Sequence, residues 1–171
     1  MIDVTCALIR NDEGLVLAVR RGPAMDNAGK WEFPGGKLIF DRLRQKYVAL
    51  TPEEWVRQHF VNYLTEYLHY PSGLIQVEAS LTLNTMKRRA DILIHDRSGG
   101  PVMVVECKAP GVKLTQAVLD QVINYNFTYG VRWVAVTNGI MHRTGKIDRT
   151  ANSISLLDHV PDYETVISPE P

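Results

Sequence analysis

The chain has 171 residues, of which 45% are hydrophobic, and its 19 basic and 19 acidic side chains give a formal net charge of zero. These values are ordinary for a soluble globular domain and exclude a protein that is basic overall, so any contact with DNA needs a local basic patch. Two cysteines do not suggest a disulfide scaffold or a zinc site, and no apolar run approaches the roughly 20 residues of a membrane span.

The first 37 residues predict two strands, a loop and a short motif. Residues 2–10 and 15–20 are apolar-rich and flank a hairpin turn signal. The later segment Trp31-Glu-Phe-Pro-Gly-Gly36 resembles the opening of a Nudix hydrolase. The glutamate box that holds the metal in Nudix enzymes does not follow Lys37. A Nudix-type nucleotide pyrophosphatase is therefore an alternative that the missing box argues against, and residues 1–37 are expected to be a Nudix-like hairpin fragment, natural or engineered.

A second hairpin and a helix are predicted next. Residues 38–40 and 46–50 form short strands around a polar turn. The sequence Thr51-Pro-Glu-Glu54 indicates a helix start, with threonine as the N-cap, proline in the first turn and Glu54 at the capping-box position. Apolar residues at a spacing of four extend the amphipathic pattern to about residue 69.

Three strands follow the helix, over residues 74–83, 90–95 and 102–107. The first carries Glu78, which we expect to face solvent, although it could point toward a site. The other two are rich in Ile, Leu and Val and are joined by the turn sequence Asp-Arg-Ser-Gly-Gly-Pro, which predicts an antiparallel hairpin.

Charged residues are expected to meet at the open end of this hairpin. If the turn centres between residues 98 and 99, paired residue numbers sum to 197 and Asp91 lies opposite Glu106. Lys108 should share the face of Glu106, because side chains alternate along a strand, while Cys107 points into the core.

Two acids and a lysine arranged in this way have a chemical use. Carboxylate oxygens suit Mg²⁺ or Mn²⁺, and such an ion can polarise a phosphodiester and lower the pKa of a bound water. The ammonium of Lys108 can orient that water or stabilise charge on the phosphate. The alternative is a surface hairpin with an ordinary acid–lysine pair.

The remaining chain predicts one more helix and three strands. Thr115 caps a helix that runs to about residue 127, on which Gln121 and Tyr125 are neighbours at a spacing of four. Periodicity alone would leave that pair structural. Strands are predicted over residues 131–137, 140–147 and 153–157, and the polar end after Pro161 is expected to be frayed.

These features resemble the PD-(D/E)XK nuclease superfamily. Asp91, Glu106 and Lys108 match its hairpin motif, and the Gln121 to Tyr125 element is similar to that of the RecB-like branch. Residues of about 38–165 more closely resemble the N-terminal nuclease-like domain of type I restriction enzyme R subunits, in a short stand-alone form. The matching stretches are residues 38–41, 46–60, the hairpin and 136–139.

The resemblance implies a fold and a set of roles. The fold is an α/β, restriction-endonuclease-like αβββαβ core with a mixed central sheet, preceded by the β-hairpin extension. Asp91 and Glu106 would bind Mg²⁺ or Mn²⁺ together with the backbone carbonyl of Cys107. Lys108 would position water, Gln121 would assist, and Glu54 would join the site unless its role is only to cap the helix.

The expected partners are DNA and, through the resemblance, subunits of a restriction system. Lys87, Arg88 and Arg89 form the best basic patch for DNA, with Tyr125 bordering the site, and a second cluster lies at residues 42–46. We expect a metal-dependent DNA endonuclease in the bacterial cytoplasm, with residues 1–37, 38–165 and 166–171 as hairpin, nuclease-like domain and tail. A non-catalytic DNA- or protein-binding module of the same fold is the alternative.

Overall fold

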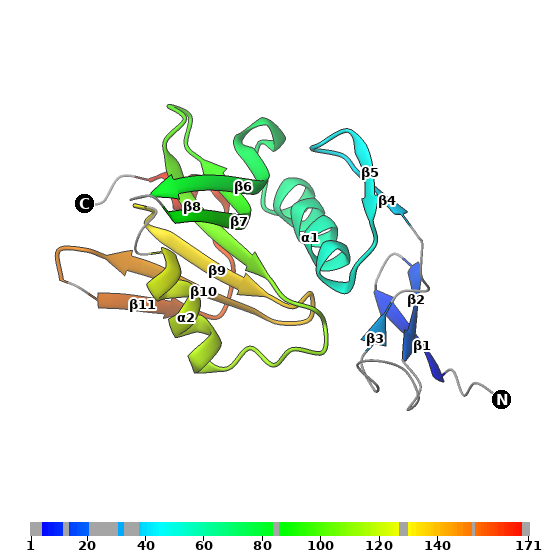
Figure 1. Ribbon diagram of the computed structural model, residues 1–171. Helices are drawn as coiled ribbons and strands as arrows, with labels where there is room; N and C mark the ends of the chain where they lie inside the picture. Colours follow the sequence, from blue (N-terminus) through cyan, green and yellow to red (C-terminus); the bar gives the residue numbers. More distant parts are fainter. Residues whose placement is uncertain are drawn as a thin grey trace.

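The computed structural model describes residues 5–11, 14–20, 31–32, 38–83, 86–126, 130–151 and 153–168 (Figure 1). Side chains are described for residues 38–80, 89–118, 120, 122–123, 130–151 and 153–168. Outside the main domain, three short strands form an antiparallel sheet in the order β1-β2-β3, which confirms the predicted N-terminal hairpin. Their bounds are β1 Thr5–Asn11, β2 Gly14–Arg20 and β3 Trp31–Glu32.

The centre of the domain is a six-stranded mixed sheet in the order β11-β10-β9-β8-β7-β6. Strands β8 and β9 run parallel, and all the other neighbouring pairs are antiparallel. The parallel pair is possible because helix α2 provides the crossover between them. The strands are β6 Ile75–Leu83, β7 Met86–His95, β8 Pro101–Cys107, β9 Trp133–Thr137, β10 His142–Asp148 and β11 Ser153–Leu157.

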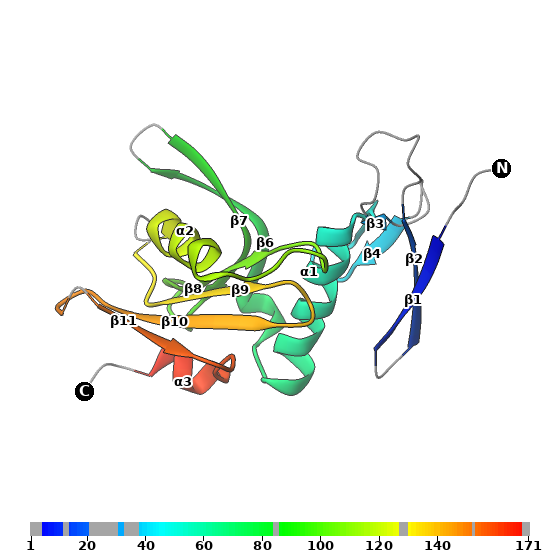
Figure 2. The same cartoon turned by 90° about the horizontal axis from the view of Figure 1, so that it is seen from below.

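Helices cover both faces of this sheet (Figure 2). Helix α1 (Pro52–Asn62) continues as a short π-helix (Tyr63–Tyr67), and it shares one core cluster with α3 (Tyr163–Ile167). Helix α2 (Gln116–Asn126) packs on the opposite face through Val122 and Ile123. The element order from α1 to β9 is therefore helix, strand, strand, strand, helix, strand, which confirms the αβββαβ core expected from the sequence.

A two-stranded hairpin, β4 (Leu38–Asp41) and β5 (Lys46–Ala49), precedes α1, as predicted. Figure 1 shows this hairpin beside α1, on the side away from the sheet. No helix in the described part of the chain is both long and apolar enough to cross a membrane.

The end of the chain differs from the prediction. We expected the residues after Pro161 to be frayed, but Asp162 caps α3 by accepting a hydrogen bond from the Thr165 backbone N–H at 2.8 Å. Tyr163 and Val166 are buried against the sheet, and the Tyr163 hydroxyl donates to the His95 carbonyl at 3.1 Å. Two apolar anchors three residues apart are enough to fix this turn, and so short a pattern carries little periodic signal.

Thr51 forms half of the predicted capping box. Its hydroxyl oxygen accepts a hydrogen bond from the Glu54 backbone N–H at 3.0 Å, while its own N–H donates to the Ala49 carbonyl and not to the Glu54 carboxylate. Thr51→Ala should therefore lower the free energy of unfolding by about 1 kcal/mol, as loss of an N-cap usually does. Urea denaturation will measure this loss, and Thr51→Ser, which keeps the acceptor oxygen, should retain most of the stability. Equal losses in the two variants would show that the hydroxyl does not cap the helix.

Candidate active site

The β7–β8 hairpin has the register that the sequence predicts from Ile92 to Ile94, and the register shifts by one residue at His95, which pairs with Pro101. Ile92 pairs with Val105, Leu93 with Val104 and Ile94 with Met103, so each pair sums to 197. One further step along the same register places Asp91 opposite Glu106, directly beyond Ile92 and Val105, the last paired residues of the two strands. The two acids therefore come from adjacent strands at one end of the hairpin.

Strands β6 and β7 both change face at this point. Val77 and Ile92 pack into the α1-side cluster, whereas Ala79 and Ala90, two positions away, pack into the α2-side cluster. Residues two apart share a face in a regular strand, so the alternation is broken at Glu78 and Asp91. Glu78 has φ of 52°, in the left-handed region that non-glycine residues seldom adopt. Figure 2 shows β6 after Glu78 and β7 before Asp91 leaving the sheet together on the side of α2.

The Asp91 carboxylate lies where β7 and β8 diverge. Its Oδ2 accepts a hydrogen bond from the Cys107 backbone N–H at 2.8 Å. Without Asp91, this N–H would lack a partner on β7. Its Oδ1 accepts a hydrogen bond from Arg57 Nη2 at 2.9 Å. Asp91 is thus fixed by β8 on one side and by α1 on the other.

Glu106 and Lys108 share one face, as expected, and form an ion pair of 2.8 Å between Oε1 and Nζ. Burial raises the pKa of the Glu106 carboxyl, and the charge of Asp91 raises it further against the opposing effect of Lys108. Burial acts to lower the pKa of Lys108, but its hydrogen bond to Glu106 and the charges of Glu106 and Asp91 outweigh burial, so that the pKa is raised. Lys108 is therefore a cation at neutral pH in this structure.

Cys107 points away from this site, as predicted. Its side chain is buried in the α1-side cluster, and burial raises the pKa of the thiol well above its ordinary value. A neutral buried thiol is a poor metal ligand, because metals bind the thiolate. Any contribution of Cys107 to a metal site must therefore come from its backbone carbonyl, as we expected.

The raised pKa of Glu106 predicts a pH effect on stability. The folded state holds this proton more tightly than the unfolded chain, whose carboxyl has a pKa of 4.5. The contribution of Glu106 to stability therefore decreases as pH rises from 4.5 through the folded-state pKa. Glu106→Gln lacks this loss, so its stability relative to the wild type should increase with pH, measured by urea denaturation between pH values of about 4 and 8. Glu66→Gln, at an exposed glutamate, is the control, and a flat difference for Glu106→Gln would contradict the assignment.

A buried network of charged side chains adjoins Asp91. Arg57 Nη1 lies 2.6 Å from Glu54 Oε2 and 3.0 Å from Glu78 Oε1. Arg44, from the β4–β5 turn, bonds Glu54 Oε1 at 2.8 Å and also pairs with Asp41 and Glu78. The Glu78 side chain is thus only 26% exposed and lies among arginines, and the expectation that it faces solvent is wrong. The left-handed backbone at Glu78, which sequence does not reveal, turns its side chain inward.

Glu54 takes part in this network and does not contact Glu106 or Lys108 through any described hydrogen bond or ion pair. Besides the two arginines, Gln58 Nε2 donates to Glu54 Oε1 at 2.7 Å and to Asp41 Oδ2 at 2.9 Å. The helix therefore presents Glu54 toward the same arginine that binds Asp91. Its link to Asp91 is indirect, through Arg57.

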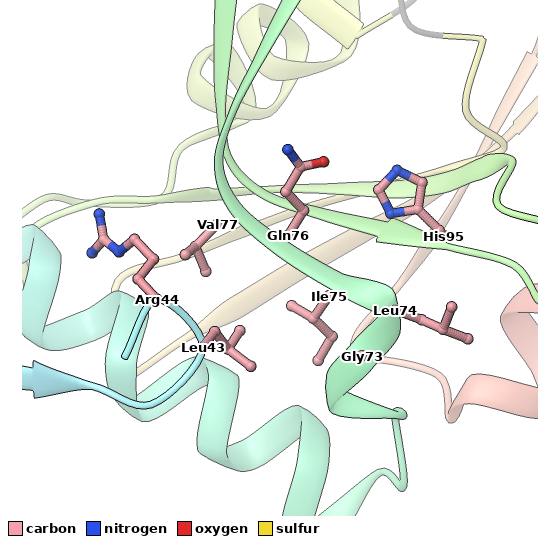
Figure 3. Close-up of a pocket in the computed structure, with 8 residues that line it drawn as sticks. All are labelled: Leu43, Arg44, Gly73, Leu74, Ile75, Gln76, Val77 and His95. Atoms are coloured by element: carbon pink, nitrogen blue, oxygen red, sulfur yellow. The ribbon is translucent and has the colours of Figure 1, made fainter. Parts of the chain in front are cut away.

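Two open hollows border Arg44. One, of about 390 Å³, lies between the β4–β5 turn and the start of β6, with Leu43 facing Ile75 across it (Figure 3). The other, of about 410 Å³, is lined by Tyr47 of β5, Glu53, Glu54 and Arg57 of α1, and Glu78. The second hollow gives the charged network an opening to solvent.

The other predicted site residues are placed only in part. Gln121 and Tyr125 lie on α2, and Lys87 and Arg88 lie on β7, but their side chains are outside the described residues. Arg89 is described: its side chain is 58% exposed and pairs with Glu78. Arg44 and Arg57 were missed by the sequence analysis as parts of the site, although Arg57 is one helical turn from Glu54, a spacing that allows such a pair.

Fold and site together define a mixed α/β domain with an acid–acid–lysine cluster at the divergence of two central strands. The family model for the type I restriction enzyme R protein N terminus (HSDR_N) matches residues 52–161, which is more than half of the chain. The chain belongs to this family. The matched segment contains Glu54, Asp91, Glu106, Lys108 and Gln121, and it excludes the N-terminal sheet.

Solved structures show a distant likeness. A fragment assigned to the HsdR subunit of a type I restriction enzyme from Vibrio vulnificus YJ016 is 21% identical with a TM-score of 0.49, over 68% of this chain and 24% of that chain. A protein from Anabaena variabilis ATCC 29413, assigned as a nuclease of the DUF820 group, is 14% identical with a TM-score of 0.43. The match covers 79% of this chain and 82% of that chain. The chain therefore spans about a quarter of the HsdR fragment. The comparison with curated proteins found no match.

Proposed function

We propose that this chain hydrolyses phosphodiester bonds of DNA with Mg²⁺ or Mn²⁺, using Asp91, Glu106 and Lys108. The observation that carries the proposal is that the two carboxylates flank the point where β7 and β8 diverge, with the Lys108 ammonium 2.8 Å from Glu106. Burial raises the pKa of the Glu106 carboxyl, and the charge of Asp91 raises it further. Membership in the R-protein family supports the same function.

The donor atoms fit a hard divalent ion. Asp91 and Glu106 offer carboxylate oxygens and Cys107 offers a backbone carbonyl, which are the ligand types that Mg²⁺ and Mn²⁺ prefer. Within the described part of the chain, no group of three or more His, Cys, Asp or Glu side chains could hold a metal, so water and DNA phosphate would complete the shell. When bound, the ion would polarise the phosphodiester and lower the pKa of a water.

The protein residues then have distinct roles. Lys108 is held as a cation by Glu106 and would orient the attacking water or stabilise negative charge on the phosphate. Gln121, and Glu54 through Arg57, would support the site. Lys87, Arg88, Arg89 and Tyr125 would contact DNA, of which Arg89 has an exposed side chain. Subunits of a restriction system are the proposed protein partners.

Incubation of the purified chain with plasmid DNA tests this proposal. We expect nicking or linearisation with Mg²⁺ or Mn²⁺, and none with a chelator. A Glu106→Gln preparation, purified in parallel, controls for contaminating nucleases because it loses one of the two proposed carboxylate ligands. Equal cleavage by both proteins, or cleavage that survives the chelator, would refute the proposal.

One observation favours the alternative of a non-catalytic binding module. The carboxylates of Asp91 and Glu54 are already paired with arginine, and Glu106 is already paired with lysine. A module of this kind would bind DNA or a partner subunit without taking up a divalent ion. Calorimetric titration of the chain and of Glu106→Gln with Mg²⁺ separates the two, since only the nuclease requires ion binding that depends on Glu106.

A further inference from the structure

Arg57 is positioned to act on the proposed metal site, although it comes from a helix outside the β7–β8 hairpin. Its Nη2 lies 2.9 Å from Asp91 Oδ1, while its Nη1 contacts Glu54 Oε2 at 2.6 Å and Glu78 Oε1 at 3.0 Å. The side chain is 8% exposed, and its Nε makes no hydrogen bond within the described residues. One guanidinium thus joins three carboxylates from α1, β6 and β7.

The charges around the site are nearly balanced without a divalent ion. Five carboxylates lie in the combined cluster, and four cations lie among them, which leaves a formal charge of one negative unit. The carboxylates are Asp41, Glu54, Glu78, Asp91 and Glu106, and the cations are Arg44, Arg57, Arg89 and Lys108. A divalent ion that binds Asp91 must therefore approach a carboxylate that a buried guanidinium already neutralises.

We propose that Arg57 competes with the metal ion for Asp91, so that this arginine sets the metal affinity of the site. The inference rests on the proposed function, because it takes Asp91 as a metal ligand. Arg57 is a positioning residue, because it would act on the ion only through Asp91. Arg57 holds Asp91 in place while no ion is bound. The Asp91–Arg57 contact would weaken when the carboxylate coordinates the ion.

Calorimetric titration with Mn²⁺ alone tests the competition. Arg57→Gln keeps polar hydrogens near Asp91 but removes the charge, and it should bind Mn²⁺ about 10-fold more tightly than the wild type, since a neighbouring opposite charge changes the cation affinity of a carboxylate by at least that factor. Arg57→Lys restores a charge and should return the affinity toward the wild-type value. Arg97→Gln, at an exposed arginine on the β7–β8 turn, should change nothing.

A second variant addresses the risk that Arg57→Gln does not fold, which far-ultraviolet circular dichroism will show. The double variant Arg57→Gln/Glu78→Gln loses one acid together with the arginine and so keeps the charge balance. It should bind Mn²⁺ more tightly than Glu78→Gln alone. Two results would overturn the competition. One is that the folded Arg57 variants bind Mn²⁺ with the affinity of their reference proteins, and the other is that no variant binds Mn²⁺.

The plasmid assay distinguishes this failure from failure of the proposed function. Metal-dependent cleavage by the wild type together with unchanged Mn²⁺ affinity in the Arg57 variants would overturn only the competition. Tighter Mn²⁺ binding by Arg57→Gln without cleavage by any protein would support the competition and refute hydrolysis.

Discussion

Replacing Lys108 with alanine should lower the rate of Mg²⁺-dependent DNA cleavage by roughly 10²–10³-fold, the usual cost of removing one charged or hydrogen-bonding group that stabilises a transition state. The geometry gives the reason. Lys108 Nζ is held 2.8 Å from Glu106 Oε1 and remains protonated, so it presents a fixed positive charge beside the proposed metal ligands. Its loss removes that charge while both carboxylates stay in place.

The control for this variant is Lys113→Ala, at an exposed lysine in the segment that follows β8. Cleavage of plasmid DNA, followed over time at saturating Mg²⁺, should be unchanged by the control. Binding of Mn²⁺ to Lys108→Ala should be retained or strengthened, since the variant removes a positive charge from the site. Equal cleavage rates for Lys108→Ala and the wild type would remove Lys108 from the mechanism.

Replacing Arg44 with methionine should lower the free energy of unfolding by about 3–5 kcal/mol, the range measured when one partner of a buried ion pair is removed. Arg44 is 15% exposed and pairs with Asp41, Glu54 and Glu78. Hydrogen bonds from Arg44 and Gln58 keep the pKa of Asp41 low in spite of burial, which alone would raise it. Without the arginine, the buried Asp41 carboxylate loses its ion-pair partner, and Glu54 and Glu78 lose one of the cations that they share.

Arg42→Met provides a matched control in the same hairpin. The Arg42 side chain is 70% exposed and lies 3.9 Å from the exposed Glu66, so its loss should cost less than about 1 kcal/mol. Urea denaturation at neutral pH measures both variants. Similar small losses at the two positions would mean that Arg44 does not join the β4–β5 hairpin to the core.

The parts of the site that could be predicted from sequence are those set by local rules. The turn chemistry of residues 96–101 predicted the antiparallel pairing of β7 and β8, and the register that placed Asp91 opposite Glu106 holds from Ile92 to Ile94, although it shifts by one residue next to the turn. Strand alternation put Cys107 in the core and Lys108 beside Glu106. The helix start at Thr51 followed from its N-cap and the proline after it.

The parts that were missed depend on contacts between distant segments. Arginines on an amphipathic helix are usually exposed, so nothing local marks Arg57 as buried. Arg44 reaches Glu78 across 34 positions in the chain, and Glu78 turns inward because of a left-handed backbone that glutamate rarely adopts. The network exists because the β4–β5 hairpin, α1 and β6 meet there, and only the assembled fold brings these three elements together.

The most direct measurement of the central claim is diffraction from crystals of the chain soaked in Mn²⁺, with the ion located by its anomalous scattering. We expect one strong peak between the carboxylates of Asp91 and Glu106, within ligand distance of both and close to the Cys107 carbonyl. A peak that touches neither carboxylate, or an Mn²⁺-soaked crystal in which Asp91 remains bound to Arg57 with no peak beside it, would contradict the account.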